Sequence, residues 1–504
     1  MSAAAPAGRS PGLQRALILV SVILATTLYA TTMTIANVAL PQMQGDLSAS
    51  IDQIAWVLTF NIVATAIATP PTGWLAARLG RKRLLLGAIT GFTISTVLCG
   101  LSTSLVELIV WRTCQGLFGA PLVPLSQAIT LDTYPPEQHG TATALWGLGV
   151  MLGPILGPTV GGYMTELYDW RWVFFVVAPF GIVALLGCLA FVPETGRDPT
   201  RRLDWLGFVA LSVAVAATQL MFDRGQRQDW FESREIILWA AIAALGFYLF
   251  VTHSLTAARP FFDLRMFLDR NFAVGLVLMA VFGLLVFVPM LLIPTMLERL
   301  RGFPVLMIGL LLAPRGLGTM LAMIVCGRLV TRIDPRLLLA VGFLGQGMST
   351  WLMSQFNLDT GPNEVFWAAL LQGFGVGMMF VPLTMITFAT LPVELRTDGS
   401  ALFHLLRNLG SSIGIALAVT YLTRSTQHNR AELAEFASPL NEILRAPGLF
   451  GDWDLSSQAG LAAIELEINR QASMIAYVND FHVMTLLALA ALPLILLARN
   501  VRTP

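Results

Sequence analysis

The sequence contains a single lysine, Lys82, and charged residues make up only 12% of its 504 residues. The phosphate-binding loop that ends in Gly-Lys-Ser/Thr cannot be built, because Lys82 stands between two arginines. This absence argues against ATP as the direct energy source. The net charge of +1 also argues against a nucleic-acid partner, since such proteins carry a basic excess.

Cysteine and clusters of catalytic side chains are scarce too. The four cysteines, Cys99, Cys114, Cys188 and Cys326, all fall inside apolar stretches, so we expect packing residues rather than a disulfide or a metal site. We expect no cofactor. Paired aspartates or histidine-rich clusters near the apolar stretches are missing, which makes a membrane-embedded enzyme a remote alternative. No small-residue cleavage site follows the first apolar stretch, which predicts a retained helix.

Apolar residues are what the sequence has in excess. They make up 56% of the chain, and the mean hydropathy is +0.71, which predicts an all-α, multi-pass membrane protein. Lysine and arginine are more frequent in the segments on the side of the two termini, which predicts that both termini are cytoplasmic. We count about 14 apolar stretches of spanning length: 14–39, 53–77, 84–102, 106–131, 141–165, 172–192, 204–222, 235–255, 271–296, 306–330, 337–355, 364–390, 399–423 and 480–498.

The two ends of the chain repeat one another. The segment Gly73–Arg78 recurs as Gly327–Arg332, and Gln115-Gly116 recurs as Gln372-Gly373. Gly153 and Gly157 recur as Gly410 and Gly414, and all of the offsets lie between 253 and 258 residues. We predict two six-helix bundles, 1–200 and 259–504, with two inserted helices in 201–258. Parallel halves of this kind enclose a substrate site at mid-membrane in secondary transporters.

Four glycines recur at every fourth position of one apolar stretch, where they share a helix face and permit close packing of a neighbouring helix. Prolines follow two of them, which predicts a bend. The residues are Gly149, Gly153, Pro154, Gly157, Pro158 and Gly161.

Several motifs together resemble the major facilitator superfamily, in its 14-helix drug:proton antiporter branch of the EmrB/QacA type, over essentially the whole length. The resemblance implies the major facilitator fold and proton-coupled multidrug efflux across the bacterial inner membrane by alternating access. The matching segments are Gly73–Lys82, with Gly73, Arg78, Gly80 and Arg81; Arg112–Gly116; Gly149–Gly162; Ile35–Pro41; Asp204–Gly207; Asp223–Gly225; and Arg407–Gly414.

Two positions depart from the family pattern. Thr32 stands where family members often carry a first-helix aspartate, which puts the usual proton-binding residue in doubt. Ala77 stands where the loop motif usually carries an aspartate, and we expect Arg78 to pair instead with Asp132 at the end of the fourth helix.

Proton coupling requires an ionisable group whose environment changes when the transporter switches sides. An arginine stays protonated, so it tunes a neighbour or binds an anion rather than carrying the proton itself. By family resemblance Arg112 is our first choice, and Arg407 is the second. The titratable candidates are Glu107, Asp223, His404 and Asp480, and we hypothesise that at least one of them replaces the missing aspartate.

We expect a wide, mostly apolar cavity with a few polar contacts, which suits lipophilic cargo. Without the first-helix aspartate, neutral or weakly acidic compounds fit better than dications. The expected lining residues are Tyr29, Thr32, Asn37, Gln115, Gln127, Met151, Gln346, Gln372 and Met378.

The segment 424–479 is the only long loop between the predicted spans, and we place it outside. It ends in an amphipathic stretch, Ser456–Val478, with Leu461, Ile464, Ile468 and Ile475 loosely on one face. The resemblance implies that this loop docks a periplasmic adaptor of the EmrA-like membrane fusion type, which leads to an outer-membrane channel. A helix that lies against the bilayer or against the protein's own helix bundle is the alternative. Export of one specific metabolite, such as a siderophore, fatty acid or antibiotic, also remains open.

Overall fold

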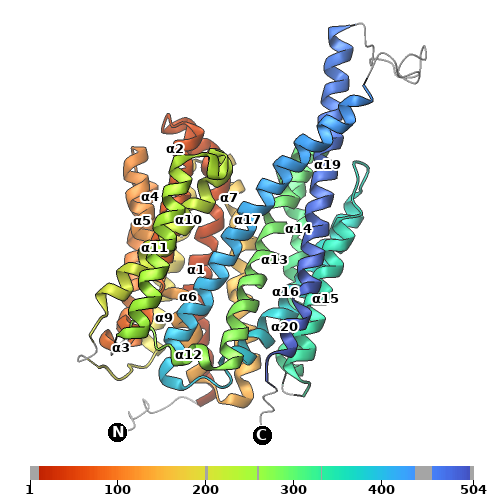
Figure 1. Cartoon of the computed structure of the whole chain (residues 1–504). Coiled ribbons are helices and arrows are strands. Elements are labelled where there is room, and N and C mark those ends of the chain that lie inside the picture. Colours follow the sequence, from red (N-terminus) through yellow and green to blue (C-terminus); the bar gives the residue numbers. More distant parts are fainter. Residues whose placement is uncertain (1–10, 199–201, 258–259, 331, 438–456, 500–504) are drawn as a thin grey trace.

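A computed structural model describes residues 11–198, 202–257, 260–330, 332–437 and 457–499, and their regular structure is helical (Figure 1). Each predicted apolar stretch falls on one helix or on two consecutive helices. The helices are α1 (Pro11–Asp46), α2 (Ile51–Ala68), α3 (Thr72–Leu79), α4 (Arg81–Leu101), α5 (Leu105–Gly119), α6 (Leu122–Thr133), α7 (His139–Leu167), α8 (Trp172–Phe175), α9 (Ala178–Phe191), α10 (Trp205–Gly225), α11 (Arg234–Thr256), α12 (Arg265–Leu268), α13 (Arg270–Arg301), α14 (Val305–Leu329), α15 (Pro335–Met353), α16 (Pro362–Phe388), α17 (Arg396–Glu435), α19 (Gln458–Ala490) and α20 (Leu492–Leu496).

Length and composition support a multi-pass membrane protein. Among the residues described, 11 helices are long and apolar enough to cross a membrane, or 12 if the bent pair α2–α3 forms one span. The bend between α2 and α3 is 57°, and it falls at Pro70-Pro71, where proline removes backbone donors. A polar cap marks the start of α2, where the Ser50 hydroxyl accepts a hydrogen bond from the backbone N–H of Gln53.

The internal repeat is visible in equivalent helix crossings. In the first half α7 crosses α1, and a Cβ on Gly153 would lie 2.6 Å from the Thr31 nitrogen. In the second half α17 crosses α13, and a Cβ on Gly410 would overlap the backbone of Ala280. Gly116 and Gly373 likewise meet the backbone of α2 and α14. The repeated glycines therefore mark the points where helices approach too closely for a side chain.

The glycine face of α7 packs as the spacing predicts. Gly149, Gly153, Gly157 and Gly161 all face α1, and the Thr27 hydroxyl donates to the Gly149 carbonyl at 2.8 Å. The chain remains helical through both prolines, from His139 to Leu167.

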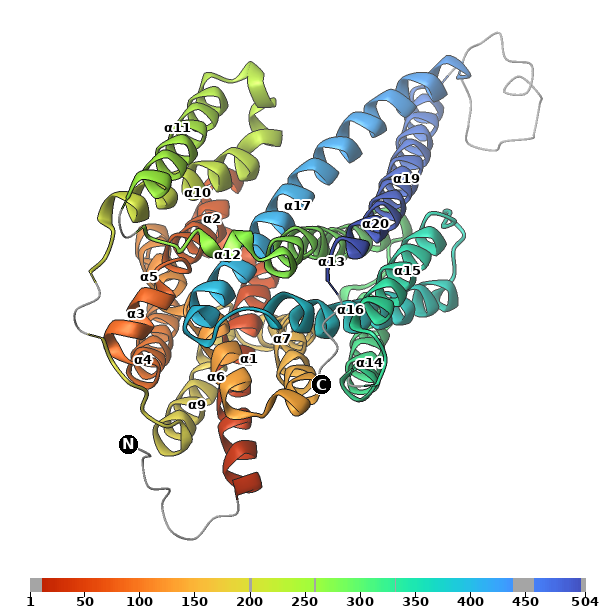
Figure 2. The ribbon, with the colours of Figure 1, turned by 60° about the horizontal axis from the view of Figure 1, so that its bottom comes forward.

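The helices form two groups, α1–α9 and α13–α20, with the pair α10–α11 beside α2 (Figures 1 and 2). We call the end where α1 begins and α20 ends the inner end, and the opposite end the outer end. Near the outer end α10 contacts both groups, because Asp223 accepts a hydrogen bond from Thr59 of α2 while Gln219 donates to Ser412 of α17 at 2.8 Å. Helix α11 leaves its apolar surface largely exposed, as a lipid-facing helix would.

The long segment predicted as an outer loop is helical at both of its ends. Helices α17 and α19 run on past the other helices and form a projecting pair at the outer end (Figure 1). The amphipathic stretch is therefore part of α19 and not a separate surface helix, which corrects that prediction; residues 438–456 lie outside the described part. Ile464 is buried, but Leu461 and Ile475 are exposed, because only one side of α19 packs on α17.

Candidate functional site

A polar contact at the middle of the molecule joins the two halves. Gln127 of α6 lies against α17, where its side-chain oxygen accepts hydrogen bonds from Ser400 at 2.6 Å and from the His404 ring at 2.8 Å. The Trp146 ring of α7 packs edge-on against His404, with ring centroids 6.0 Å apart. All four side chains are buried, and the hydrogen bonds of the Gln127 oxygen partly compensate for the removal of Gln127, Ser400 and His404 from water.

A small cavity lies beside this contact. Its volume of about 10 Å³ is close to the room that one water molecule needs. Residues from α1, α2, α17 and the α5–α6 break line it, so it sits between the halves: Tyr29, Thr65, Thr69, Ala120, Val123, Pro124, His404, Arg407 and Asn408. Of the nine residues expected to line a cavity, only Tyr29 lines this one.

The other expected lining residues lie away from this cavity, and most of the polar ones form hydrogen bonds elsewhere in the helices. Thr32 bonds to the Leu28 carbonyl of its own helix, and Gln346 donates to the Leu285 carbonyl. Gln115 bonds to Arg112 and Thr96, whereas Gln372 is buried with no partner for either polar atom of its side chain. Asn37 is exposed, Met151 is half-buried and Met378 is buried.

Sequence reasoning missed the threonines of the cavity wall. Thr65 and Thr69 are one helical turn apart, on the α2 segment that also carries the buried Asn61. A polar stripe with a spacing of four inside an apolar span is the signal that points to them.

Three buried or half-buried arginines differ in their surroundings. Arg112 bonds to the Gln115 side chain at 2.5 Å and to the Val57 carbonyl at 3.4 Å, and it lies within the first half. Arg315 donates to the Val286 carbonyl at 3.1 Å within the second half. Arg407 lies at the boundary, where its hydrogen bonds within the described part of the chain run to Asn408. None of the three forms an ion pair with a carboxylate of the described chain.

The acidic candidates for proton coupling lie apart from the cavity. Glu107 is exposed and caps the start of α5 through Thr103. Asp223 bonds to Thr59 near the outer end. Asp480 is buried within the second half, and its Oδ2 has no hydrogen-bond partner. Of the four titratable candidates, the structure places only His404 on the cavity.

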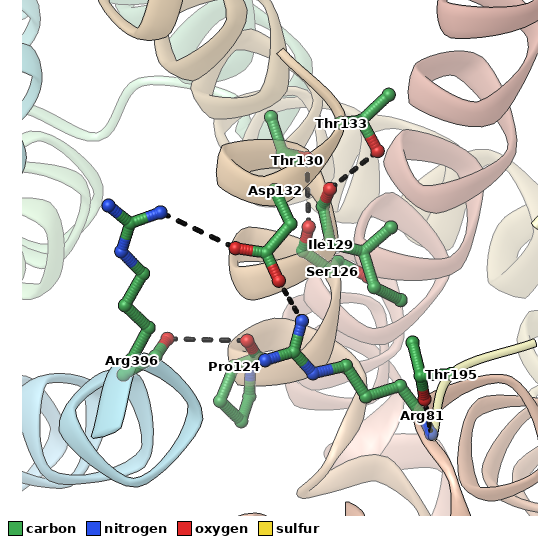
Figure 3. Close-up of polar contacts among 10 residues, drawn as sticks. Arg81, Pro124, Ser126, Ile129, Thr130, Asp132, Thr133, Thr195 and Arg396 are labelled. Carbon is green, nitrogen blue, oxygen red and sulfur yellow. Dashed lines mark hydrogen bonds and ion pairs between the residues drawn. The ribbon is translucent and has the colours of Figure 1, made fainter. Parts of the chain in front are cut away.

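An ion pair connects the halves at the inner end, and a second one lies beside it within the first half. Asp132, at the end of α6, pairs with Arg81 of α4 and with Arg396 of α17, whose Nη1 lies 3.4 Å from the carboxylate (Figure 3). The expected partner, Arg78, instead stacks on Trp74 at 5.3 Å, so that prediction was wrong. The reason is local: Gly80 has φ +89°, and this turn starts α4 at Arg81, beside the end of α6.

A carboxylate from the second half also reaches the first half here. Asp398, in the first turn of α17, is buried against α3, and a Cβ on Gly73 would overlap its carboxylate. Ala77 occupies the place of the usual family aspartate on this same helix. The acidic side chain at this junction therefore comes from α17 rather than from α3.

Helices α7 and α14 complete the inner closure. A Cβ on Gly140 would overlap Val330, and a Cβ on Gly327 would lie 2.9 Å from Ala144. The Thr141 hydroxyl donates to the Gly327 carbonyl at 3.3 Å. Together with the Asp132 ion pairs, this crossing holds the inner end shut.

Two duplicated six-helix halves that meet around a small polar centre define the class of secondary transporters. Over residues 22–415 the chain matches the model of the Major Facilitator Superfamily. It is 36% identical over 440 residues to the Multidrug export protein EmrB of Escherichia coli (strain K12), which covers 86% of this chain and 85% of that protein. The chain therefore belongs to the Major Facilitator Superfamily, and within it to the EmrB type.

Two further similarities extend the comparison. The chain is 33% identical over 472 residues to the Fatty acid resistance protein FarB of Neisseria gonorrhoeae, which covers 92% of each protein. Its fold resembles the crystal structure of the human organic anion transporter MFSD10 (TETRAN), with a TM-score of 0.61 and 17% identity, over 94% of this chain and 99% of that one.

Proposed function

We propose that this protein exports lipophilic drugs and toxic compounds across the bacterial inner membrane by alternating access, driven by the proton gradient and without a cofactor. The observation that carries the proposal is the closed inner end, where the Asp132–Arg396 ion pair, the contact of Asp398 with Gly73 and a helix crossing at glycines join the halves. Partly exposed ion pairs contribute about 1 kcal/mol or less, so they can break and re-form in each cycle. The multidrug export named for the EmrB relative supports the cargo class.

The buried contact between Gln127 and His404 at the boundary between the halves supports proton coupling. Opening the inner end would separate Gln127 from His404, so the surroundings of this histidine depend on which side is open. A histidine whose surroundings alternate can bind and release a proton in each cycle. Arg112 remains the first residue to test, and Arg407, Glu107, Asp223 and Asp480 remain candidates.

An adaptor partner fits the outer projection. We infer that both termini are cytoplasmic, which places the α17–α19 pair in the periplasm. Arg430 and Glu465 link its two helices there at 2.6 Å. A pair of helices that extends past the membrane offers a surface for an EmrA-like adaptor, which would lead to an outer-membrane channel.

Proton release from everted vesicles with an imposed pH gradient tests the proposal. Lipophilic acids, neutral compounds and cations would be added one at a time to vesicles with wild-type protein, Arg112→Ala or Arg112→Lys. We expect substrate-triggered proton release by the wild type and its loss in Arg112→Ala. An unchanged response in Arg112→Ala would remove Arg112 from coupling. The absence of any response, with export also absent, would contradict proton-driven multidrug efflux.

Export of one specific metabolite is the second candidate. The fatty acid resistance named for FarB, which matches 92% of this chain, favours a fatty acid as that metabolite. The same panel separates the candidates. Release by many unrelated compounds supports multidrug export, whereas release by fatty acids alone supports the narrower function.

A further inference from the structure

Of the three buried or half-buried arginines described above, Arg407 is the one that lines the cavity between the halves. Its guanidinium group has five N–H donors, but its hydrogen bonds run only to the Asn408 side-chain oxygen, at 3.3 and 3.4 Å. Both distances are long for a hydrogen bond from a charged donor, which usually measures about 2.7–2.9 Å. The side chain nevertheless has only 7% of its surface exposed.

No carboxylate of the described chain compensates for this charge. Asp398 lies at the inner end, more than two turns before Arg407 on the same helix, and Asp480 lies on α19 away from the cavity lining. A buried charge without a partner is costly, and a charge that the protein leaves unpaired is available to an anion from outside.

The surroundings of Arg407 suit an anionic headgroup with an apolar tail. Tyr29, Thr65, Thr69 and Asn408 place neutral polar groups on the same cavity wall. Apolar side chains from the end of α5 and the start of α6 complete the wall: Ala120, Val123 and Pro124.

We propose that Arg407 binds the carboxylate of a lipophilic anionic cargo at the boundary between the two halves. The proposal rests on the function proposed above and narrows its substrate class. The guanidinium fork matches a carboxylate in geometry, and the wall at Ala120, Val123 and Pro124 receives the first carbons of the tail. A cavity of about 10 Å³ is too small for such a cargo, so binding requires the halves to move apart at one end.

A competition experiment tests the proposal directly. Purified protein in nanodiscs of neutral lipid at pH 8 would bind radiolabelled decanoate, with displacement by unlabelled decanoate, 1-decanol or decylammonium and with empty nanodiscs subtracted. We expect decanoate to displace at least about tenfold better than the other two compounds. We expect Arg407→Gln to weaken decanoate binding at least about tenfold, and Arg407→Lys to weaken it less, because the charge remains.

Arg424→Gln is the matched control, because Arg424 is an exposed arginine on the same helix. It should bind decanoate like the wild type. The proposal would be overturned if 1-decanol competed as well as decanoate, or if Arg407→Gln bound decanoate normally. Displacement by phosphatidylglycerol at lower concentration than by decanoate would also overturn it, since the site would then hold a lipid. If Arg407→Gln fails to fold, the proposal is still tested by the relative potency of the competitors on the wild type and by decanoate binding to Arg407→Lys.

The outcome can be separated from that of the proposed function. Arg407-dependent decanoate binding without proton-coupled export of any compound would support the site and contradict the pump. If neutral compounds are exported with proton coupling but Arg407→Gln binds decanoate normally, only the anion site would be contradicted.

Discussion

The two ends of the boundary between the halves are built differently. At the inner end the halves touch directly, through the Asp132–Arg396 ion pair, the contact of Asp398 with Gly73 and the crossing of α7 with α14. At the outer end α10 lies between them, bonded to α2 through Asp223 and to α17 through Gln219. In the described contacts, the halves therefore pack directly on each other at the inner end, whereas α10 links them at the outer end.

This difference shows how a duplicated fold becomes asymmetric. The halves repeat the same glycine crossings, so each half is rigid in the same way. At the inner end the equivalent glycines Gly73 and Gly327 each meet a helix of the other half, whereas the inserted α10 at the outer end has no counterpart in the repeat. Alternating access requires two states of similar free energy, and the inner contacts favour the state in which the inner end is shut.

The largest expected effect comes from filling the α7–α14 crossing. Gly140→Leu would overlap Val330 and prevent closure of the inner end, and overpacking of this kind costs about 1–3 kcal/mol. We expect transport to fall at least about tenfold and Cys326, buried on α14 near this crossing, to react with a thiol reagent applied from the inner side.

The measurement uses a Cys114→Ser background, since Cys114 is half-buried and the other cysteines are buried. Gly87→Leu is the control, because a Cβ there meets nothing within 4 Å. If Gly140→Leu transports normally with Cys326 still protected, the α7–α14 crossing is not the seal.

Removal of the inner ion pairs should have the next largest effect. Asp132→Asn loses the pairs with Arg81 and Arg396, which we expect to shift the balance of states by about 1 kcal/mol, or about fivefold. Labelling of Cys326 and the initial rate of transport report the shift. Arg78→Gln, which removes only the stacking on Trp74, should change both less. A larger effect of Arg78→Gln would restore Arg78 as the partner that the sequence suggested.

Removal of the hydrogen bond between α10 and α17 near the outer end should have a smaller effect on transport. Gln219→Ala removes the hydrogen bond from α10 to Ser412, which contributes about 1 kcal/mol, and the outer end has no direct seal that depends on it. We expect transport to change less than about threefold. Thr218→Val, which removes only a bond to the Ala214 carbonyl of its own helix, is the control. A loss of transport as large as that of Gly140→Leu would show that α10 holds the halves together.

The smallest effect is expected on the outer projection. Arg430 and Glu465 form an ion pair with side chains 51% and 60% exposed, and such pairs contribute less than about 1 kcal/mol. Arg430→Gln should leave both the melting temperature and transport by the pump alone unchanged. A large drop in the melting temperature would mean that the projection stabilises the bundle, in contrast to the ends compared above.

The helices and their repeat were predictable because the bilayer restricts the options. Apolar stretches of spanning length must form helices in lipid, and the glycine spacing predicts which face packs closely. Each predicted stretch accordingly falls on one helix or on two consecutive helices, and Gly149, Gly153, Gly157 and Gly161 pack on α1 as expected. The outer segment was misjudged because its polar helices lie beyond the membrane, where hydropathy gives no signal.

The candidate site was only partly predictable. Tyr29, His404 and Arg407 could be picked out as polar groups in apolar spans, and the structure brings them to one cavity. Their neighbours Thr65, Thr69 and Pro124 come from other helices and were missed. The partner of Asp132 was also missed, since Arg78 and Arg81 are three residues apart and only the turn at Gly80 decides which one reaches the end of α6.

Hydropathy and residue spacing were enough to predict the membrane-spanning helices and the duplication, because lipid restricts the backbone to helices and close helix crossings require small residues. The closed end of the boundary, the arginine that lines the cavity and the carboxylate that meets α3 became clear only from the packing of the helices. These depend on side chains hundreds of residues apart that meet only when two halves pack, and no local pattern in the chain encodes that meeting.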